Sequence, residues 1–338
     1  MTSGQSVLRI LCFGVSLAFL VESCHSPNAV SMQNEKTSIN PLLCNPDSGV
    51  CEIPGVIESQ LSGEITTTEK PVTIIYFTDP ICSSCWGIEP QLRKLKLEYG
   101  NYIHIEYRMG GLLPNWSYNS GGISKPSDVA HHWDEVSKYY DMPIDGDVWL
   151  EDPLDSSYPP SIAFKAAQMQ DEQKAIVFLR ELREMVFLQK KNITKWEYMA
   201  IAASNAGLDA NKLKIDYESN AHLLFEEDLK YARKLGVRGF PTLFFVDKNG
   251  AQEQIYGSRP YGDFETVLLK LAPNAQKVNY DRTWKALFLN YPSLTLNEFA
   301  TLSGMPRKDA EMLLQQLTQD KFLSQIITKN GILWESNF

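Results

Sequence analysis

Residues 79–86 read Asp79-Pro80-Ile81-Cys82-Ser83-Ser84-Cys85-Trp86, and this short stretch decides the fold. Just before it, residues 72–77 form a run of β-branched and aromatic side chains that is typical of a buried strand. Beyond Cys82, apolar side chains recur at helical spacing over residues 92–99, and residues 103–109 alternate apolar and polar side chains like another strand. The order predicts a strand-helix-strand unit with two cysteines at the start of its helix.

The spacing of the two cysteines predicts redox chemistry. Three residues apart, Cys82 and Cys85 share one face of a helical turn and can form a disulfide. If Cys82 caps the helix, unpaired N–H groups and the positive helix end lower its pKa below the free value of about 8.5. We therefore predict that Cys82 attacks and Cys85 resolves the mixed disulfide. The alternatives are half of a zinc site, which usually needs four ligands, or two inert thiols.

The rest of this domain follows from later patterns. From about residue 112 to 220, loops rich in Trp, Pro and Gly are followed by amphipathic helices, which we interpret as an α-helical insertion. Strand patterns return at residues 242–247 and 252–256 with the turn chemistry of a hairpin. A helix over 261–271 completes an α/β domain that we place at residues 55–272.

The chain resembles the DsbA family of thioredoxin-like proteins in the order of its motifs. The resemblance rests on Asp79-Pro80-x-Cys82-x-x-Cys85-Trp86-Gly87, the helical insertion, and Val237-Arg238-Gly239-Phe240-Pro241-Thr242 before a strand. It is strongest to the branch of the FrnE-like dithiol-disulfide isomerases and the SpxH/YjbH adapters of the ClpXP protease. It implies a thioredoxin-like fold and an oxidoreductase or isomerase that acts on protein or peptide thiols without a cofactor or a bound metal.

The resemblance also implies a substrate site on the returning strand. By it, Pro241 is a cis-proline facing the disulfide, with Phe240, Thr242 and Trp86 beside a bound peptide. About one X–Pro bond in twenty is cis in folded proteins, so a cis bond here would mark a site. The alternative is an ordinary trans-proline at the start of a strand.

One position departs from the family pattern. Many relatives carry an acidic residue six positions before the first motif cysteine, and Tyr76 occupies that place here. Proton transfer to and from Cys85 then falls to water or to another group, either Asp79 or Glu89. The sequence does not decide between these two carboxylates, nor whether the protein oxidises, isomerises or reduces its substrates.

A second pair, Cys44 and Cys51, encloses the turn-forming residues 45–49. The pair is either a structural disulfide that closes a short loop, or a second redox pair that exchanges with Cys82 and Cys85. We favour the structural disulfide, because small closed loops often serve as staples and an oxidising compartment preserves them.

The N-terminus resembles a lipoprotein leader. The apolar run over residues 10–21 follows Arg9 and is too short to span a bilayer, but it suits the core of a signal peptide. Residues 21–24, Val-Glu-Ser-Cys, resemble a bacterial lipobox, with the glutamate as a departure. We therefore expect lipid modification at Cys24 and a location in the cell envelope. If translation starts at Met32 instead, the protein is cytoplasmic.

Residues 278–338 form a separate block, in which three helical patterns precede an alternating hairpin. This order predicts a small winged-helix-like module. The module carries six basic and six acidic residues, and the whole chain has a formal net charge of −9. The zero net charge of the module and the negative net charge of the chain both argue against nucleic-acid binding through phosphate attraction. We expect the module to pack on the main domain or to contact a protein.

These observations favour two functions over a third, a zinc-dependent interaction. The first is a protein dithiol-disulfide oxidoreductase with thiol or disulfide substrates, a redox partner and, if lipidated, a membrane anchor. The second is a non-catalytic ClpXP-type adapter or redox-sensing protein that contacts a protease or its substrate through the C-terminal module. The predicted organisation comprises a leader, a tether with the cysteine loop, the thioredoxin-like domain and the module, at residues 1–24, 25–54, 55–272 and 278–338 respectively.

Overall fold

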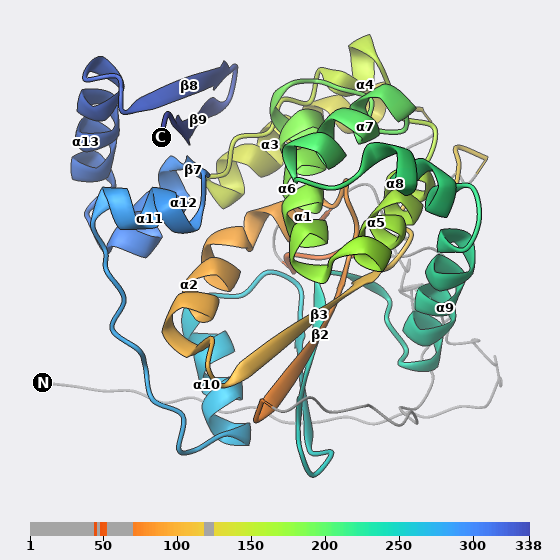
Figure 1. The fold of residues 1–338 in the computed structure, drawn as a ribbon, viewed down its shortest axis with the longest axis horizontal. Coiled ribbons are helices and arrows are strands. Elements are labelled where there is room, and N and C mark those ends of the chain that lie inside the picture. Colours follow the sequence, from red (N-terminus) through yellow and green to blue (C-terminus); the bar gives the residue numbers. More distant parts are fainter. Residues whose placement is uncertain (1–43, 46–47, 53–69, 118–124) are drawn as a thin grey trace, which may run out of the picture. The chain divides into compact units, whose positions relative to one another are not determined.

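A computed structural model of the protein describes residues 44–45, 48–52, 70–117 and 125–338. All of these residues, which Figure 1 draws in colour, fall within one unit of the chain, residues 38–338. The predicted leader, the lipidation site Cys24 and the alternative start at Met32 lie outside the described residues. Among the helices that the structure describes, none has the length and apolarity needed to cross a membrane.

A four-stranded sheet in the order β3-β2-β5-β6 forms the centre of the thioredoxin-like domain. Strand β2 (Val72–Thr78) pairs in parallel with β3 (Ile103–Met109) and antiparallel with β5 (Thr242–Asp247), which continues into β6 (Gln252–Tyr256). Every residue of β2 is buried, as its β-branched and aromatic composition predicts for a strand covered on both faces. The sheet therefore brings β5 beside the strand that leads into the cysteine motif.

The helix expected after Cys82 is two helices. Helix α1 (Ser83–Gly87) begins at the cysteine motif, and α2 (Glu89–Tyr99) continues after a break at Ile88. Pro90 lies in the first turn of α2, where its missing N–H has no helical partner to lose. The parallel β2–β3 connection thus passes through both helices, and α10 (Tyr261–Leu271) packs against α2, β5 and β6.

Between β3 and β4 (Gly239–Phe240) all regular elements of the described residues are helices, and these continue past the expected end of the insertion at about residue 220. The added helix α9 is amphipathic, and its residues Phe225 and Ala232 are buried against the core. The helices of this insertion are α3 (Ser127–Tyr140), α4 (Val148–Glu151), α5 (Tyr158–Gln170), α6 (Glu172–Leu188), α7 (Trp196–Asn205), α8 (Ala210–Tyr217) and α9 (Ala221–Lys234).

The C-terminal residues have a sheet and a core of their own. The sheet has the order β7-β9-β8, and the core includes Phe288, Phe299, Leu314 and Trp334. The sequence did not predict β7, whose last residue Thr295 also caps the next helix. In chain order the elements are α11 (Trp284–Asn290), β7 (Ser293–Thr295), α12 (Leu296–Ser303), α13 (Arg307–Gln319), β8 (Leu323–Thr328) and β9 (Gly331–Ser336).

Two very short strands connect the cysteine loop to the thioredoxin-like domain. Strand β1 (Cys51–Glu52) pairs antiparallel with β4 (Gly239–Phe240), with Cys51 opposite Phe240. Two-residue strands have no periodicity, so the sequence pattern did not predict this pairing. The pairing places the loop against the edge that precedes Pro241.

Candidate redox site

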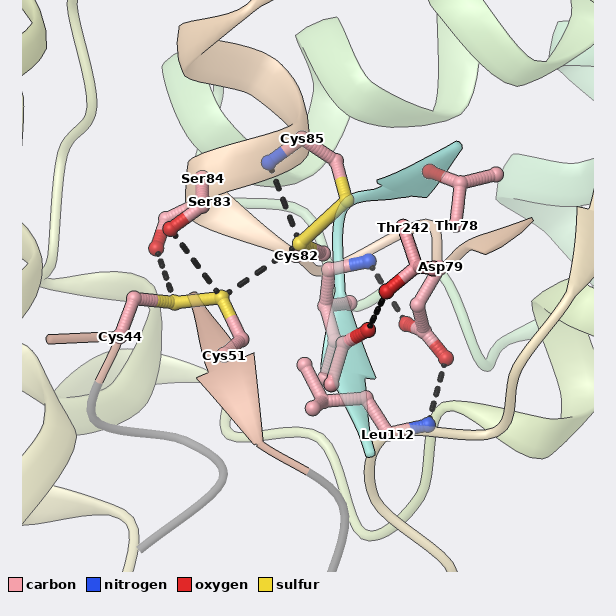
Figure 2. The surroundings of a disulfide bond; sticks show 12 residues. Cys44, Cys51, Thr78, Asp79, Cys82, Ser83, Ser84, Cys85, Leu112 and Thr242 are labelled. Atoms are coloured by element: carbon pink, nitrogen blue, oxygen red, sulfur yellow. Dashed lines mark hydrogen bonds between the residues drawn. A yellow bond between two sulfur atoms is a disulfide. The ribbon is translucent and has the colours of Figure 1, made fainter. Parts of the chain in front are cut away.

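The motif cysteines form a disulfide at the start of α1. Cys82 is the N-cap residue of α1, and the backbone N–H of Cys85 donates to its sulfur over 3.1 Å (Figure 2). Both residues are fully buried. When the bond is reduced, the sulfur of Cys82 lies where a helix N-terminus stabilises a thiolate, whereas Cys85 lies one turn further in.

The second pair, Cys44 and Cys51, also forms a disulfide, and it lies directly against the first (Figure 2). The sulfur of Cys51 is 3.4 Å from the sulfur of Cys82. The hydroxyl of Ser83 is 2.9 Å from the sulfur of Cys44, and the hydroxyl of Ser84 is 3.4 Å from that of Cys51. Both serines between the motif cysteines therefore contact the other disulfide.

Close backbone approaches hold the cysteine loop in this position. The carbonyl of Gly49 accepts a hydrogen bond of 2.7 Å from the N–H of Ser258. Gly257 has a φ of +79°, and a Cβ there would lie 2.2 Å from the carbonyl oxygen of Ser48. Glycine is therefore required at position 257 for two reasons, its backbone conformation and the space that the loop occupies.

The Phe240–Pro241 peptide bond is cis, which confirms the prediction for this bond. The three predicted substrate residues Phe240, Pro241 and Thr242 lie at the junction of β4 and β5, where the hydroxyl of Thr242 donates to the carbonyl of Gly239 over 2.6 Å. Because β4 pairs with Cys51, the backbone edge expected to receive a peptide is occupied by a segment of this chain.

Trp86, the fourth predicted substrate residue, is fully buried in the core. Its indole N–H donates to the carbonyl of Pro143 over 3.1 Å, and its ring stacks on Phe187 with the centroids 5.5 Å apart. The guanidinium carbon of Arg180 lies 4.2 Å from the centre of the ring. These contacts join α1 to the insertion, and a contribution of Trp86 to substrate binding stays a prediction.

Asp79 is the buried carboxyl group next to the motif. It accepts hydrogen bonds from the N–H groups of Ile81 (3.0 Å) and Leu112 (2.8 Å) and from the hydroxyl of Ser157 (2.8 Å). Burial nevertheless outweighs these bonds and raises the pKa of Asp79 to about 6. A carboxyl that titrates near neutral pH is suited to moving a proton.

Glu89, the other carboxylate considered for proton transfer, is less suitable, and Tyr76 at the family's acidic position does not replace it. Glu89 forms an ion pair with Arg183, whose guanidinium donates a hydrogen bond of 2.6 Å to the carboxylate. The same carboxylate also lies 3.7 Å from the guanidinium of Arg93. Burial raises the pKa of Tyr76 to about 12, so its phenol stays protonated at neutral pH. Asp79 is therefore the better of the two candidate carboxylates.

A hydrogen-bonded chain, which sequence reasoning missed, leads from this site to the C-terminal module. The hydroxyls of Ser84 and Tyr140 are 2.8 Å apart, and the side-chain amide of Asn297 donates to the carbonyl of Tyr140 over 3.0 Å. No local pattern signals a contact between residues so far apart in the chain. In the part of the chain that the structure describes, no cluster of three or more His, Cys, Asp or Glu side chains is placed to hold a metal ion.

Comparison with known proteins identifies the family. A family model described as thioredoxin matches residues 76–266. A protein of Halalkalibacterium halodurans named ClpXP adapter protein SpxH is 33% identical over 301 residues, which is 87% of this chain and 97% of the relative. The protein of the same name from Bacillus subtilis is 28% identical over 273 residues, covering 79% of this chain and 90% of the relative.

The fold has a match among solved structures. The crystal structure of a proposed protein disulfide isomerase from Nitrosomonas europaea aligns with a TM-score of 0.51 at 20% identity, over 61% of this chain and 97% of that one. This likeness supports the predicted thioredoxin-like fold with its DsbA-type helical insertion, which is confirmed. By fold and by sequence, the chain belongs to the thioredoxin-like family that includes the SpxH proteins.

Proposed function

We propose that this protein is an adapter that binds another protein and delivers it to a ClpXP-type protease. The observation that carries the proposal is the extent of the match to the SpxH protein of Halalkalibacterium halodurans, 87% of this chain and 97% of the relative. The matched share of the chain is larger than the share that residues 55–272 occupy, so the likeness extends beyond the thioredoxin-like domain.

The contacts of the C-terminal module suit an adapter. Arg307 forms a two-point ion pair with Asp141 at the end of α3, with both N–O distances 2.8 Å. Lys329 in the β8–β9 turn lies 2.7 Å from a carboxylate oxygen of Asp134 on the same helix. These pairs join the module to the helical insertion, and the proposal assigns these two parts of the protein to two different partners.

Protein turnover tests the adapter function. After translation is stopped, protein half-lives are measured by mass spectrometry in the wild type, in a strain lacking this gene and in a strain lacking the protease. An adapter predicts at least one protein that is stabilised in both mutants and degraded again when the gene is restored. The absence of any such shared client would contradict the proposal.

Thiol–disulfide exchange is the second candidate, and the geometry of Cys82 favours it. Its sulfur caps α1, and the neighbouring β4–β5 junction contains the cis bond to Pro241. Cys82→Ser should abolish exchange with a peptide disulfide, whereas Cys85→Ser should accumulate mixed disulfides because release is lost. If Cys85 is alkylated before Cys82 in the reduced protein at neutral pH, the roles are assigned wrongly.

The N-terminus separates the two functions further. A cytoplasmic protein that starts at Met32 could meet a ClpXP-type protease, whereas lipidation at Cys24 would hold the protein in the envelope. We expect lipidation if thiol exchange in the envelope is the main activity. The intact mass of the protein from its native host decides this, since a diacylated Cys24 and a chain starting at Met32 differ in mass by an unmistakable amount.

A further inference from the structure

We propose that the Cys44–Cys51 disulfide is an internal substrate of the Cys82–Cys85 pair, so that two electrons pass between the two pairs within one chain. The inference rests on the second candidate function, thiol–disulfide exchange. It gives the loop a redox function in place of the purely structural one that we favoured from the sequence.

The strand pairing presents Cys51 as a substrate cysteine would be presented. Strand β1 adds to β4 immediately before the cis bond to Pro241, and Cys51 is the residue opposite Phe240. Strand addition to an open edge is a common way in which proteins bind peptides. The backbone pairing brings the sulfur of Cys51 to 3.4 Å from that of Cys82, which is the sulfur at the helix N-terminus.

Burial gives the contact its significance. Cys51, Cys82 and Cys85 have no exposed surface, and Cys44 is 1% exposed. In this conformation an external disulfide cannot touch the sulfur of Cys82, whereas the sulfur of Cys51 already does. A disulfide that served only to close its loop could stabilise that loop without touching a second disulfide.

The exchange balances when the Cys82–Cys85 pair starts as a dithiol, which requires that an external dithiol such as dithiothreitol or a protein dithiol first reduces the pair in a conformation that exposes it. The Cys82 thiolate attacks the sulfur of Cys51, so a Cys82–Cys51 bond forms and the Cys51–Cys44 bond breaks. Cys44 leaves as a thiolate beside the hydroxyl of Ser83, which lies 2.9 Å from its sulfur and can donate to it.

The second step completes the transfer. The thiolate of Cys85 attacks the sulfur of Cys82, the Cys82–Cys85 disulfide forms, and Cys51 leaves as a thiolate 3.4 Å from the hydroxyl of Ser84. The motif pair has lost two electrons and the loop pair has gained them, while protons move between thiols and solvent. The reverse sequence carries electrons from a reduced loop to the motif disulfide.

The geometry predicts that Cys82 forms a disulfide with Cys51 and not with Cys44, which single variants can test. In Cys44→Ser, the freed Cys51 thiolate can attack Cys82 and release Cys85, with no added oxidant. We therefore expect this variant to contain a Cys51–Cys82 disulfide in a measurable fraction of molecules, with Cys85 free. The matched control is Cys51→Ser, whose free Cys44 lies beside Ser83, so its Cys82–Cys85 bond should remain intact.

The measurement is acid quenching, alkylation of free thiols and peptide mapping by mass spectrometry. The double variant Cys44→Ser/Cys85→Ser, oxidised with glutathione disulfide, provides a second and independent reading, because Cys51 and Cys82 are then its two remaining loop and motif thiols. It should form the internal disulfide in preference to glutathione adducts. Cys51→Ser/Cys85→Ser should instead yield mainly glutathione adducts, at least about tenfold over any Cys44–Cys82 bond, because the internal reaction lacks proximity.

The outcomes separate this inference from the exchange function on which it rests. If neither Cys44 variant forms a Cys51–Cys82 bond, or if both Cys51 variants form a Cys44–Cys82 bond equally well, the internal relay is refuted. Should the wild type then still exchange with an external peptide disulfide, the second candidate function survives alone. Formation of the Cys51–Cys82 bond by both Cys44 variants, without its counterpart in the controls, supports the relay.

Discussion

Arg180 on α6 holds Glu298 on α12 through two hydrogen bonds of 2.8 and 3.1 Å, and this pair joins the helical insertion to the C-terminal module. Glu298 is fully buried, and a guanidinium nitrogen of Arg93 lies 3.3 Å from it. Although burial opposes its ionisation, the two guanidinium groups hold the pKa of Glu298 below its usual value. The pair therefore stabilises the docked module at neutral pH.

Glu298→Gln should lower the free energy of unfolding by about 3 kcal/mol, because it removes the buried counter-charge that Arg180 and Arg93 share and leaves them only Glu184 and Glu89. The ionised Glu298 contributes to stability above its unfolded pKa, and this contribution disappears as the pH falls through its lower folded pKa. The destabilisation caused by Glu298→Gln should therefore be smaller in acid. Urea unfolding followed by tryptophan fluorescence measures it. Glu311→Gln, which removes an exposed partner of Arg307, is the control and should change stability by less than about 0.5 kcal/mol.

Asp79→Asn should remove a pH dependence of stability. Because the folded pKa is raised from 3.8 to about 6, the contribution of Asp79 is fully present below pH 3.8 and is lost as the pH rises through about 6. Relative to the variant, the wild type should lose up to about 3 kcal/mol between pH 4 and 7. Unfolding curves at several pH values measure the difference. The exposed Asp155→Asn controls for loss of a carboxylate, and parallel pH profiles for wild type and Asp79→Asn would contradict the burial argument.

Gly110→Ala should disturb the edge that carries Cys51. A Cβ at Gly110 would lie 1.7 Å from the ring of Phe240, which is fully buried and cannot turn away freely. We expect a loss of at least about 2 kcal/mol in unfolding free energy, together with faster alkylation of Cys51 after reduction. Gly262→Ala in α10 meets no atom within 4 Å and should be neutral or slightly stabilising. Equal effects of the two substitutions would argue against the packing at Phe240.

Tyr140→Phe tests the connection between the redox site and the module. Removing the hydroxyl breaks the 2.8 Å contact with Ser84 but keeps the ring. The substitution should lower the free energy of unfolding by about 1 kcal/mol. Burial raises the pKa of Tyr140 to about 12, so the effect should be constant between pH 6 and 9. Calorimetry at those pH values measures it. The neighbouring Tyr139→Phe, on a ring that is 56% exposed, should change stability by less than about 0.5 kcal/mol.

Local patterns predicted the parts of this molecule that depend on residues near one another in the chain. The buried strand Val72–Thr78 and the cap at Cys82 both follow from a few consecutive residues. The break at Ile88 was missed because the apolar spacing of α2 continues that of α1. The cis bond at Pro241 was predicted from the resemblance to a family, since no physical feature of residues 237–242 alone requires it.

The contact between the two disulfides could not be predicted in the same way. Cys51 and Cys82 lie 31 positions apart, and their approach depends on pairing between two strands of two residues each. Such strands carry no alternation and no turn signal, and their pairing is decided by tertiary contacts such as that between Gly49 and Ser258. The sequence therefore predicted that Cys82 and Cys85 can form a disulfide and left the role of the second pair open.

The pairing of β1 with β4 also has a consequence for competition. Because β1 belongs to the same chain, it meets the β4 edge at an effective concentration of the order of millimolar, as tethered segments do. A free peptide of equal intrinsic affinity at micromolar concentration would then occupy this edge in about one molecule in a thousand. We expect loss of the Cys44–Cys51 bond to loosen the loop that carries β1 and so to lower this advantage. On this expectation, the oxidation state of the loop sets the concentration that an outside protein needs to displace β1 from β4.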